Sequence, residues 1–500
     1  MEFALKEVIV PLCQIILLAV FLRRWFTPRV KNQPPSPRKL PIIGNFHQLG
    51  AYPHRSLQSL SRRYGPLMLL HFGKVPVLVA SSADAAREIM KNQDLVFSNR
   101  PKLSIPDRLQ YGSRDVAFSP YGEYWRQVRS ICVLHLLSMK RVQSFRRVRE
   151  EETTLLVEKM RSSSSVVNLS EELVRLTNDV VCRVALGRKY SGDAEGRKVT
   201  KMLGEFLVVL GTFNVGDYIP WLAWINKING LDGKVENVGK QFDEFLEGVI
   251  QQHRERKRDE FDGDVLVLDL VDTLLEFQRE NEGVSPVEDD TIKAVVQDMF
   301  GAGTDTISTS LEWTIAELIR NPRTMEILQN EVRKVGGNKG DIKEVDIENM
   351  PYLKAVIKES LRLHAPVPLL IPRESTQDTK VLGFEIASGT HVLINVWAIA
   401  RDPSLWKNSE EFIPERFLET NIDLRGLHFE FTPFGAGRRG CPGIAFALSV
   451  GELALAKLIH NFNFVLPNGE RGQDLDMSEV YGIVIRRKHP LLLVATSHSR

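Results

Sequence analysis

The chain has 500 residues, of which 43% are hydrophobic, 8% aromatic and 26% charged, and this composition is typical of a globular protein with a substantial core. The 65 Lys and Arg residues nearly balance the 63 Asp and Glu residues, so a net charge of +2 excludes the basic excess of nucleic-acid-binding proteins, and we expect no nucleic-acid partner. The cysteines are widely spaced without a CxxC pair, which excludes a disulfide framework and favours a reducing compartment; they are Cys13, Cys132, Cys182 and Cys441.

Residues 1–26 are predicted to form an N-terminal transmembrane anchor. Val8 to Leu22 is almost wholly apolar, and a helix from Phe3 to Phe26 reaches the roughly 30 Å that the hydrocarbon core requires. The basic residues toward and after its end place the following domain on the cytosolic side. A cleaved signal peptide is the competing interpretation, but no basic segment precedes the apolar run and no small-residue cleavage site follows it.

Residues 27–41, TPRVKNQPPSPRKLP, are rich in proline and basic residues and are predicted to form a stiff, extended hinge. Residues 42–500 contain no internal repeat and no interior boundary, so we expect a single large domain. Apolar runs predict strands at Leu67–Phe72 and Val75–Ala80, followed by mostly helical sequence to about residue 360. Short strands are expected again at Val381–Ile386, His391–Val396 and Val484–Ile485. The predicted fold class is therefore mainly α with minor β.

The segment Phe300–Thr306, FGAGTDT, lies within a long helical pattern from about Asp290 to Arg320. Its glycines and threonines make a poor helix interior, which predicts a groove or a bend at this point. Asp305 and Thr306 lie beside that groove and, in an apolar pocket, can relay protons to a reacting oxygen. The alternative is a kinked helix in which the threonine bonds to its own backbone.

Glu359 and Arg362 lie three residues apart on one face of a predicted helix. Such a pair is usually at the surface, where it contributes under about 1 kcal/mol. With Arg416, from the segment Pro414–Phe417, it can instead form a buried network that joins distant segments. The sequence leaves both alternatives open.

Residues 431–443, FTPFGAGRRGCPG, hold Cys441 among glycines and arginines. Pro442 is typical of the first turn of a helix, and Ile444–His460 is predicted to be a buried helix, so Cys441 precedes a helix N-terminus, where a thiolate is favoured. A thiolate without neighbouring Cys or His ligands suits haem, whose porphyrin leaves one axial position to the protein. The alternative is a cysteine that packs as a small apolar residue, and the four glycines and two arginines around it argue against that.

In this order, these segments resemble those of the cytochrome P450 family, and the likeness covers essentially the whole chain. The family's haem-binding pattern, Phe-x-x-Gly-x-Arg-x-Cys-x-Gly, is met in full by Phe434, Gly437, Arg439, Cys441 and Gly443. Three further motifs match. Ala302–Thr306 matches the motif of the oxygen-binding helix, and Glu359 and Arg362 match the Glu-x-x-Arg motif, with Arg416 as the third member of its network. Trp125 and Arg129 match the Trp-x-x-x-Arg motif of a helix that contacts a haem propionate. The hinge PPSPRKLPIIGN and the closing MSEVYGIVIRRKHPL resemble microsomal plant enzymes of the A-type, specialised-metabolism group.

The resemblance implies a haem b bound through the Cys441 thiolate, with its propionates held by Trp125, Arg129, Arg373 and Arg439. It implies a monooxygenase that inserts one atom of O2 into a lipophilic plant specialised metabolite, such as a terpenoid, an alkaloid or a phenolic. Thr306 and Asp305 would deliver the protons.

The chain has no dinucleotide or flavin fingerprint of its own. The resemblance therefore implies that electrons come from NADPH through a separate NADPH–cytochrome P450 reductase, with cytochrome b5 as a further candidate partner. It also implies a single-pass protein of the endoplasmic reticulum membrane whose catalytic domain faces the cytosol. Six basic residues form a candidate docking face for the reductase, with a solvated helix face as the alternative: Arg126, Lys140, Arg141, Arg146, Arg147 and Arg149.

By the same resemblance, the substrate pocket should be walled by the segments Ser104–Phe118 and Leu203–Asn214 and by individual side chains further along. These are Ala302, Val367, Leu369, Leu370, Ile371, Tyr481 and Ile483. They imply an apolar substrate without an anchoring charge, although ordinary core packing is the alternative for any one of them.

Two other functions stay open. One is a reductase-independent haem-thiolate isomerase or dehydratase, and the retained Asp305–Thr306 pair argues against it because such an enzyme needs no proton relay. The other is a non-catalytic haem-binding membrane protein, and the combination of that relay with an apolar pocket argues against it.

Overall fold

The computed structural model describes residues 32–498 except 163–165, 192–193, 257–267, 282, 284–286 and 338. The predicted anchor, residues 1–26, and the first part of the predicted hinge lie outside the described residues. The rest of the hinge lies along the domain: Pro34 and Pro37 are buried, and the Leu69 N–H donates to the Pro35 carbonyl over 3.0 Å.

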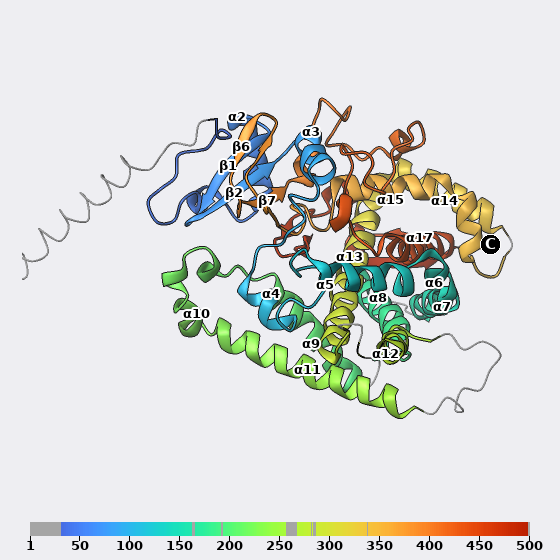
Figure 1. The fold of residues 1–500 in the computed structure, drawn as a ribbon. Helices are drawn as coiled ribbons and strands as arrows, with labels where there is room; N and C mark the ends of the chain where they lie inside the picture. Colours follow the sequence, from blue (N-terminus) through green and yellow to red (C-terminus); the bar gives the residue numbers. More distant parts are fainter. Residues whose placement is uncertain are drawn as a thin grey trace, which may run out of the picture.

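Helices form most of the fold, as predicted (Figure 1). The long helix α13 (Asp289–Arg320) runs through the middle of the molecule and packs against α8 (Leu169–Leu186). Among the described residues, the other helices of nine or more residues are α2 (Pro53–Tyr64), α5 (Glu123–Ile131), α7 (Arg146–Ser162), α9 (Ala194–Leu210), α11 (Leu231–Glu255), α12 (Leu270–Glu280), α14 (Pro322–Gly336), α15 (Pro351–Leu363) and α17 (Ile444–Asn461). Shorter ones are α3 (Ala83–Arg87), α4 (Ser104–Leu109), α6 (Met139–Ser144), α10 (Ile225–Ile228) and α16 (Val396–Ile399).

Helix α13 stays helical through the FGAGTDT segment. Four hydroxyl groups of this helix each donate a hydrogen bond to the carbonyl four residues earlier, which gives these polar side chains a partner inside the protein. They are the hydroxyls of Thr306, Ser308, Ser310 and Thr314. Gly303 lets α8 approach closely, since a Cβ at this position would lie 3.1 Å from Val181 Cγ2. The residues that weaken this helix in isolation therefore serve its tertiary packing.

The main sheet has four strands in the order β1-β2-β7-β4. Strands β1 (Leu67–Phe72) and β2 (Val75–Ala80) are the predicted antiparallel pair, and β7 (His391–Ile394) joins β2 in parallel from a distant part of the chain. The remaining strands are β3 (Val167–Asn168), β4 (Arg373–Glu374), β5 (Thr379–Val381), β6 (Phe384–Ile386), β8 (Phe462–Val465), β9 (Glu479–Val480), β10 (Arg486–Arg487) and β11 (Leu492–Ser497).

Three strand predictions differ from the structure. The strand predicted at His391–Val396 ends at Ile394, because Asn395 caps the short helix α16 and Val396 begins it. Residues 381–386 belong to a hairpin of β5 and β6, because Leu382 and Gly383 have φ angles of 48° and 86° and turn the chain between the strands. Val484–Ile485 precedes β10 instead of forming a strand. The backbone of Ile485 is engaged elsewhere, because its N–H donates to the Pro366 carbonyl and its own carbonyl accepts from the Trp313 indole.

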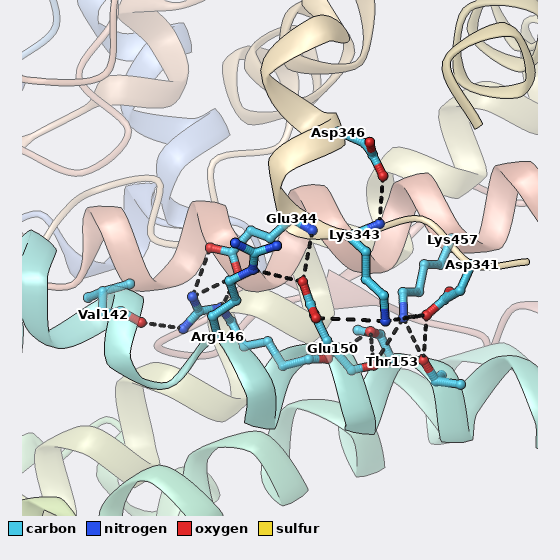
Figure 2. Close-up of polar contacts among 11 residues, drawn as sticks. Val142, Arg146, Glu150, Thr153, Asp341, Lys343, Glu344, Asp346 and Lys457 are labelled. Carbon is cyan, nitrogen blue, oxygen red and sulfur yellow. Dashed lines mark hydrogen bonds and ion pairs between the residues drawn. The ribbon is translucent and has the colours of Figure 1, made fainter. Parts of the chain in front are cut away.

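A buried polar network joins α7 and α17 to the segment before α15 (Figure 2). Arg149 of α7 is fully buried and forms a two-pronged ion pair with Glu344 at 2.8 Å. Lys457 of α17 is also fully buried, and its ammonium group lies 2.9 Å from Asp341 Oδ2. We call these four residues the closed network, because each cation meets a carboxylate of the protein.

Two of the described segments are long and apolar enough to cross a membrane, Lys198–Asp217 and Ile444–Asn461. The second is α17, which is mostly buried in the core and follows the predicted haem-binding motif. Its apolar character is therefore explained by core packing.

Candidate active site

A cavity of about 300 Å³ lies between α13 and the segment that precedes α17. Helix α13 lines it with Ala302, Gly303 and Thr306, among others. Seven of the eight residues predicted to bind haem also line it: Trp125, Arg129, Arg373, Phe434, Arg439, Cys441 and Gly443. The sequence motifs, although far apart along the chain, thus converge on one place.

Cys441 lies at the cavity wall just before α17, as expected. Its sulfur accepts a hydrogen bond from the Gly443 N–H at 3.3 Å, and its own N–H donates to the Phe434 carbonyl over 2.9 Å. Burial nevertheless raises the pKa of the Cys441 thiol, although the Gly443 N–H and the Arg129 guanidinium lower it. The Gly443 N–H and the Arg129 guanidinium thus act on the sulfur in the direction that the helix N-terminus predicts, and burial acts against them.

The glycine-rich loop 431–443 is held by Asp94, a residue that the sequence analysis missed. Gly437, the predicted haem-motif residue that does not line the cavity, has a φ of 68°, and a Cβ there would lie 2.3 Å from the Met90 carbonyl oxygen. The next residue, Arg438, bonds to Asp94 Oδ2 through its N–H at 3.0 Å and its guanidinium at 2.9 Å. Asp94 carries no recognisable sequence signal, because its partner lies 344 residues away.

Four arginines line the cavity: the predicted Arg129, Arg373 and Arg439, and Arg100, which the sequence analysis missed. We call them the cavity arginines. Among the residues that the structure describes, only Arg373 of these four has a carboxylate within 4 Å, that of Asp94 at 3.1 Å. The other three donate hydrogen bonds to backbone carbonyls.

The positive charge of the cavity arginines is poorly compensated. Burial, followed by repulsion from Arg439 and Arg373, lowers the pKa of Arg100 well below its usual range. Burial and repulsion from Arg373 lower the pKa of Arg439 to about 9. Both shifts reflect the free-energy cost of holding these charges close together inside the protein.

These groups fit a haem. Two propionate carboxylates would neutralise the buried guanidinium groups, and the apolar side chains between them suit the porphyrin plane. The Cys441 thiol is placed to supply one axial ligand.

Thr306 and Asp305 have different surroundings. The Thr306 hydroxyl lines the cavity and donates to the Ala302 carbonyl over 2.5 Å, as in the alternative that the sequence left open. The Asp305 carboxylate does not line the cavity. It forms an ion pair, at 2.7 Å, with Nη2 of Arg486, whose side chain is 43% exposed. Burial raises the pKa of Asp305, although Arg486 lowers it. The hydroxyl therefore faces the cavity and the carboxyl group lies on the side that leads to the surface.

Four of the seven predicted pocket residues line the cavity: Ala302, Val367, Leu370 and Ile371. The other three do not. Leu369 packs with the apolar cluster around β1 and β2, Tyr481 is 43% exposed, and Ile483 lies against Gly211 just after α9.

The predicted wall segments are also only partly correct. Ser104–Phe118 contributes Val116 and Ala117, but no residue of Leu203–Asn214, all of which the structure describes, lines the cavity. Helix α8 supplies wall residues that the sequence analysis missed, among them Val181, Val184 and Ala185. Their apolar spacing is that of any core helix, so the sequence offers no signal for them.

The Glu359–Arg362 pair is buried, with both side chains 0% exposed and two contacts of 2.8 and 2.9 Å. Arg416 joins it at 3.1 Å from Glu359 Oε1. Arg362 also donates to the carbonyls of Ala400 and Ser409. Of the two alternatives that the sequence left open, the buried network is therefore the one that the geometry favours.

The six basic residues considered as a docking face do not form one free surface. Arg149 is buried in the closed network, and Arg146 and Arg147 are paired with acidic residues one turn along α7. Arg141 donates to the Thr273 hydroxyl over 2.7 Å. Two remain exposed without an ion-pair partner in the described part of the chain, Arg126 and Lys140.

The sequence matches the family "Cytochrome P450" over residues 34–494. Similar curated proteins include "Cytochrome P450 71A6" from Nepeta racemosa, 63% identical over 98% of both chains, and (+)-menthofuran synthase from Mentha piperita, 58% identical over 96% of this chain and 97% of the relative. Psoralen synthase from Ammi majus is 51% identical over 97% of both. A solved zebra fish cytochrome P450 with progesterone covers 89% of this chain and all of its own, with a TM-score of 0.76 and 28% identity.

Proposed function

Because the chain belongs to the cytochrome P450 family, whose pattern matches residues 34–494, we propose that this haem b monooxygenase oxidises a lipophilic plant specialised metabolite with electrons from NADPH–cytochrome P450 reductase. The observation that carries the proposal is the single cavity at which the Cys441 thiol, the cavity arginines and Thr306 meet. Most of the other lining residues are apolar, which supports a lipophilic substrate.

In this proposal, the Cys441 sulfur would bind the haem iron, and the cavity arginines with Trp125 would hold the propionates. When bound, the haem supplies the activation of O2, which the thiolate assists by donating electron density. The Gly443 N–H bonded to the sulfur moderates that donation. Phe434 and Gly437 keep the loop in the shape that presents the sulfur.

Thr306 and Asp305 handle protons. The Thr306 hydroxyl donates to Ala302, which leaves its oxygen to accept a hydrogen bond from a cavity water or reacting oxygen. Asp305 takes protons from the surface beside Arg486, and its raised pKa helps it to hold them. Movement of Asp305 away from Arg486 would pass a proton toward Thr306.

The substrate class follows from the cavity and the relatives. Three of the similar proteins are named for menthofuran, norfluorocurarine and psoralen, which are all plant products. The lining residues Val367, Leu370 and Ile371 favour a similarly apolar molecule, such as a terpenoid, an alkaloid or a phenolic.

The surface that supports docking of the reductase, and of cytochrome b5, lies on and after α5. There Arg126 and Lys140 are exposed, and the exposed apolar side chains of Val133, Leu134 and Met139 lie between them in sequence. Exposed basic residues together with exposed apolar side chains suit an acidic electron-transfer partner.

We further propose a single-pass protein of the endoplasmic reticulum membrane, anchored by residues 1–26 and joined to the cytosolic domain, residues 42–500, by the hinge 27–41. Two segments support this, because they expose apolar side chains beside the hinge: Leu40, Ile42, Phe213, Trp221, Trp224 and Ile228. The segments are in contact, since the rings of Phe46 and Phe213 lie 5.2 Å apart. Removal of residues 1–26 should release the protein from microsomes only in part, because this apolar surface remains.

The ferrous–CO difference spectrum of the wild type and of Cys441→Ser tests the haem-thiolate site. We expect a strongly red-shifted Soret band in the wild type and its loss in the variant. Cys132→Ser is the matched control, because Cys132 also borders the cavity and should keep the shifted band. A variant Cys441→Ser with an unchanged spectrum would show that the sulfur is not the ligand.

Turnover with NADPH and the reductase separates a monooxygenase from an isomerase or a non-catalytic haem protein. Thr306→Ala should keep the haem spectrum but lower the product formed per NADPH by about tenfold or more, with peroxide formed instead. Thr309→Ala is the control, since Thr309 is buried on α13 outside the cavity lining. Unchanged product per NADPH in Thr306→Ala would remove the proposed role.

A further inference from the structure

Residues 116–119 form a strap between α13 and the residues around the predicted haem site. On one side, the strap N–H groups donate to carboxylates: those of Val116 and Ala117 to Asp298 Oδ2, at 2.7 and 3.3 Å, and that of Phe118 to Asp115 Oδ2, at 2.8 Å. The N–H groups of Val116, Ala117 and Phe118 therefore depend on two acidic side chains.

On the other side, the strap carbonyls accept from the residues that would bind the propionates. The Val116 carbonyl accepts from Trp125 Nε1 at 3.0 Å and from Arg439 Nη1 at 3.3 Å. Arg100 Nε donates to the Ala117 carbonyl over 2.8 Å, and Arg439 Nη2 to the Ser119 carbonyl over 2.6 Å. The single peptide segment thus has carboxylates on one side and cationic side chains on the other.

Asp298 connects the strap to the reaction site. It lies on α13 eight residues before Thr306, with Ala302 midway, so the three share one face of the helix, and all line the cavity. Val116 and Ala117 line the same cavity. A shift of the strap would therefore move a pocket wall and the Arg439 side chain together.

If the carboxyl groups of Asp115 and Asp298 share a proton, each supplies the hydrogen-bond partner that the other lacks. Within the described part of the chain, Asp115 Oδ1 is buried without a hydrogen-bond partner, and Asp298 Oδ1 accepts only a long bond from Gln110 Nε2, at 3.5 Å. Burial, and next the charge of the neighbouring Asp115, raise the pKa of Asp298 well above its usual range. A proton on Asp298 Oδ1 would be donated to Asp115 Oδ1, while Oδ2 of each continues to accept from the strap.

We propose that Asp298 is a positioning residue of this monooxygenase, which through the 116–119 strap fixes one wall of the substrate cavity and the side chains that hold the haem propionates. This inference rests on the proposed haem site, and it adds a residue that none of the sequence motifs contains. Asp298 acts through the backbone of the strap and needs no contact with the reacting atoms.

Asp298→Asn and Asp298→Leu are a matched pair for the test, because they are similar in size. The Asn amide oxygen can accept from the strap N–H groups and its NH2 can donate to Asp115 Oδ1, whereas Leu leaves these N–H groups and Asp115 without partners. The probes are 4-phenylimidazole, which would bind the iron and reach the cavity wall, and imidazole, which is too small to reach it.

We expect Asp298→Asn to bind 4-phenylimidazole within about twofold of the wild type, and Asp298→Leu to bind it about tenfold more weakly with a shifted haem reduction potential. Imidazole affinity should change by less than about twofold in both variants. Two results would overturn the inference: Asn as harmful as Leu, or Leu equal to the wild type in both readouts.

If Asp298→Leu does not take up haem, hydrogen exchange in the wild-type holoenzyme decides. The amides of residues 116–118 should exchange slowly, and exchange as fast as in an exposed loop would refute the strap. A wild type that lacks the red-shifted CO band would instead contradict the proposed haem-thiolate site, so the two failures are distinguishable.

Discussion

Two clusters of positive charge inside this protein are stabilised in opposite ways. In the closed network, Arg149 and Lys457 lie 2.8 and 2.9 Å from carboxylates of the protein itself. Around the cavity, three of the four cavity arginines have only backbone carbonyls as hydrogen-bond acceptors within the described residues, and burial lowers their pKa values.

The difference predicts a separate role for each cluster. Charges that are balanced within the protein contribute to the fold, whether or not a ligand is bound. Charges held without carboxylates lower the stability of the protein alone, and a ligand that carries two carboxylates recovers that free energy on binding. Loss of a residue from the closed network should therefore appear as lost stability, and loss of a cavity arginine as lost haem affinity.

The largest effect is expected from Arg149→Met. It leaves Glu344 without its ion-pair partner, so we expect the free energy of unfolding to fall by about 3–5 kcal/mol with and without haem. Urea unfolding followed by circular dichroism measures it. A loss confined to the haem-loaded protein would erase the distinction between the two clusters.

Arg129→Met should mainly lower the haem affinity and should change the stability of the apoprotein little. Its guanidinium bonds to the Gly440 carbonyl at 2.5 Å, and burial lowers its pKa, so the apoprotein should lose less than about 1 kcal/mol. Haem affinity should fall by about 10- to 100-fold, the value of one charged hydrogen bond. Haem transfer to apomyoglobin gives the affinity, and urea unfolding of the apoprotein is the control. Unchanged haem transfer would mean that Arg129 does not hold a propionate.

A third ionic cluster, around Glu479, extends the comparison, because protonation of its carboxylate at low pH removes its ion pairs. Glu479 lies 3.0 Å from His54 Nε2 and 2.7 Å from Arg55 Nε. Burial alone would raise the pKa of Glu479, but the hydrogen bonds from His54 and Arg55 lower it from the usual 4.5 to about 2. Because the folded-state pKa is depressed, these contacts stabilise the fold above about pH 4.5, and their contribution is lost as the pH falls toward 2.

Glu479→Gln should therefore lower the free energy of unfolding at pH 7 by about 1–2 kcal/mol, and the difference from the wild type should shrink as the pH falls below 4.5. Urea unfolding at a series of pH values checks this. An equal loss at pH 7 and at pH 3 would mean that the carboxylate charge is not the cause.

The smallest effect is expected from Arg147→Met, two positions from Arg149 on the same helix. Its side chain is 90% exposed and pairs with Glu151 one turn away, so the loss should be about 0.5 kcal/mol or less. A loss as large as that of Arg149→Met would show that substitution on α7 is harmful regardless of burial.

The sequence predicted the elements with the strongest local patterns. Strands β1 and β2 match to the residue, α13 and α17 match to within a residue or two, and the glycine-rich loop with Cys441 is where it was expected. These elements carry either an apolar periodicity or a motif whose residues are close together in the sequence.

The errors concern contacts made across long sequence separations. Asp94 and Arg100 line or hold the site through partners more than 250 residues away, which no local pattern reveals. Leu369 and Ile483 have the composition of pocket residues, yet tertiary packing turns them toward other clusters. Asp305 was expected to share the pocket with Thr306, but one step along a helix rotates a side chain by about 100°, and Arg486 holds it there.

The span of the haem site along the chain also determines when in protein synthesis the site can exist. Arg129 meets Gly440 across 311 residues, and Arg439 meets Ser98 across 341. A ribosome delivers the N-terminal arginines first and the cysteine loop almost last. A nascent chain therefore carries Arg100 and Arg129 long before Arg439 and the Cys441 thiol emerge, and cofactor capture is an event of the finished polypeptide.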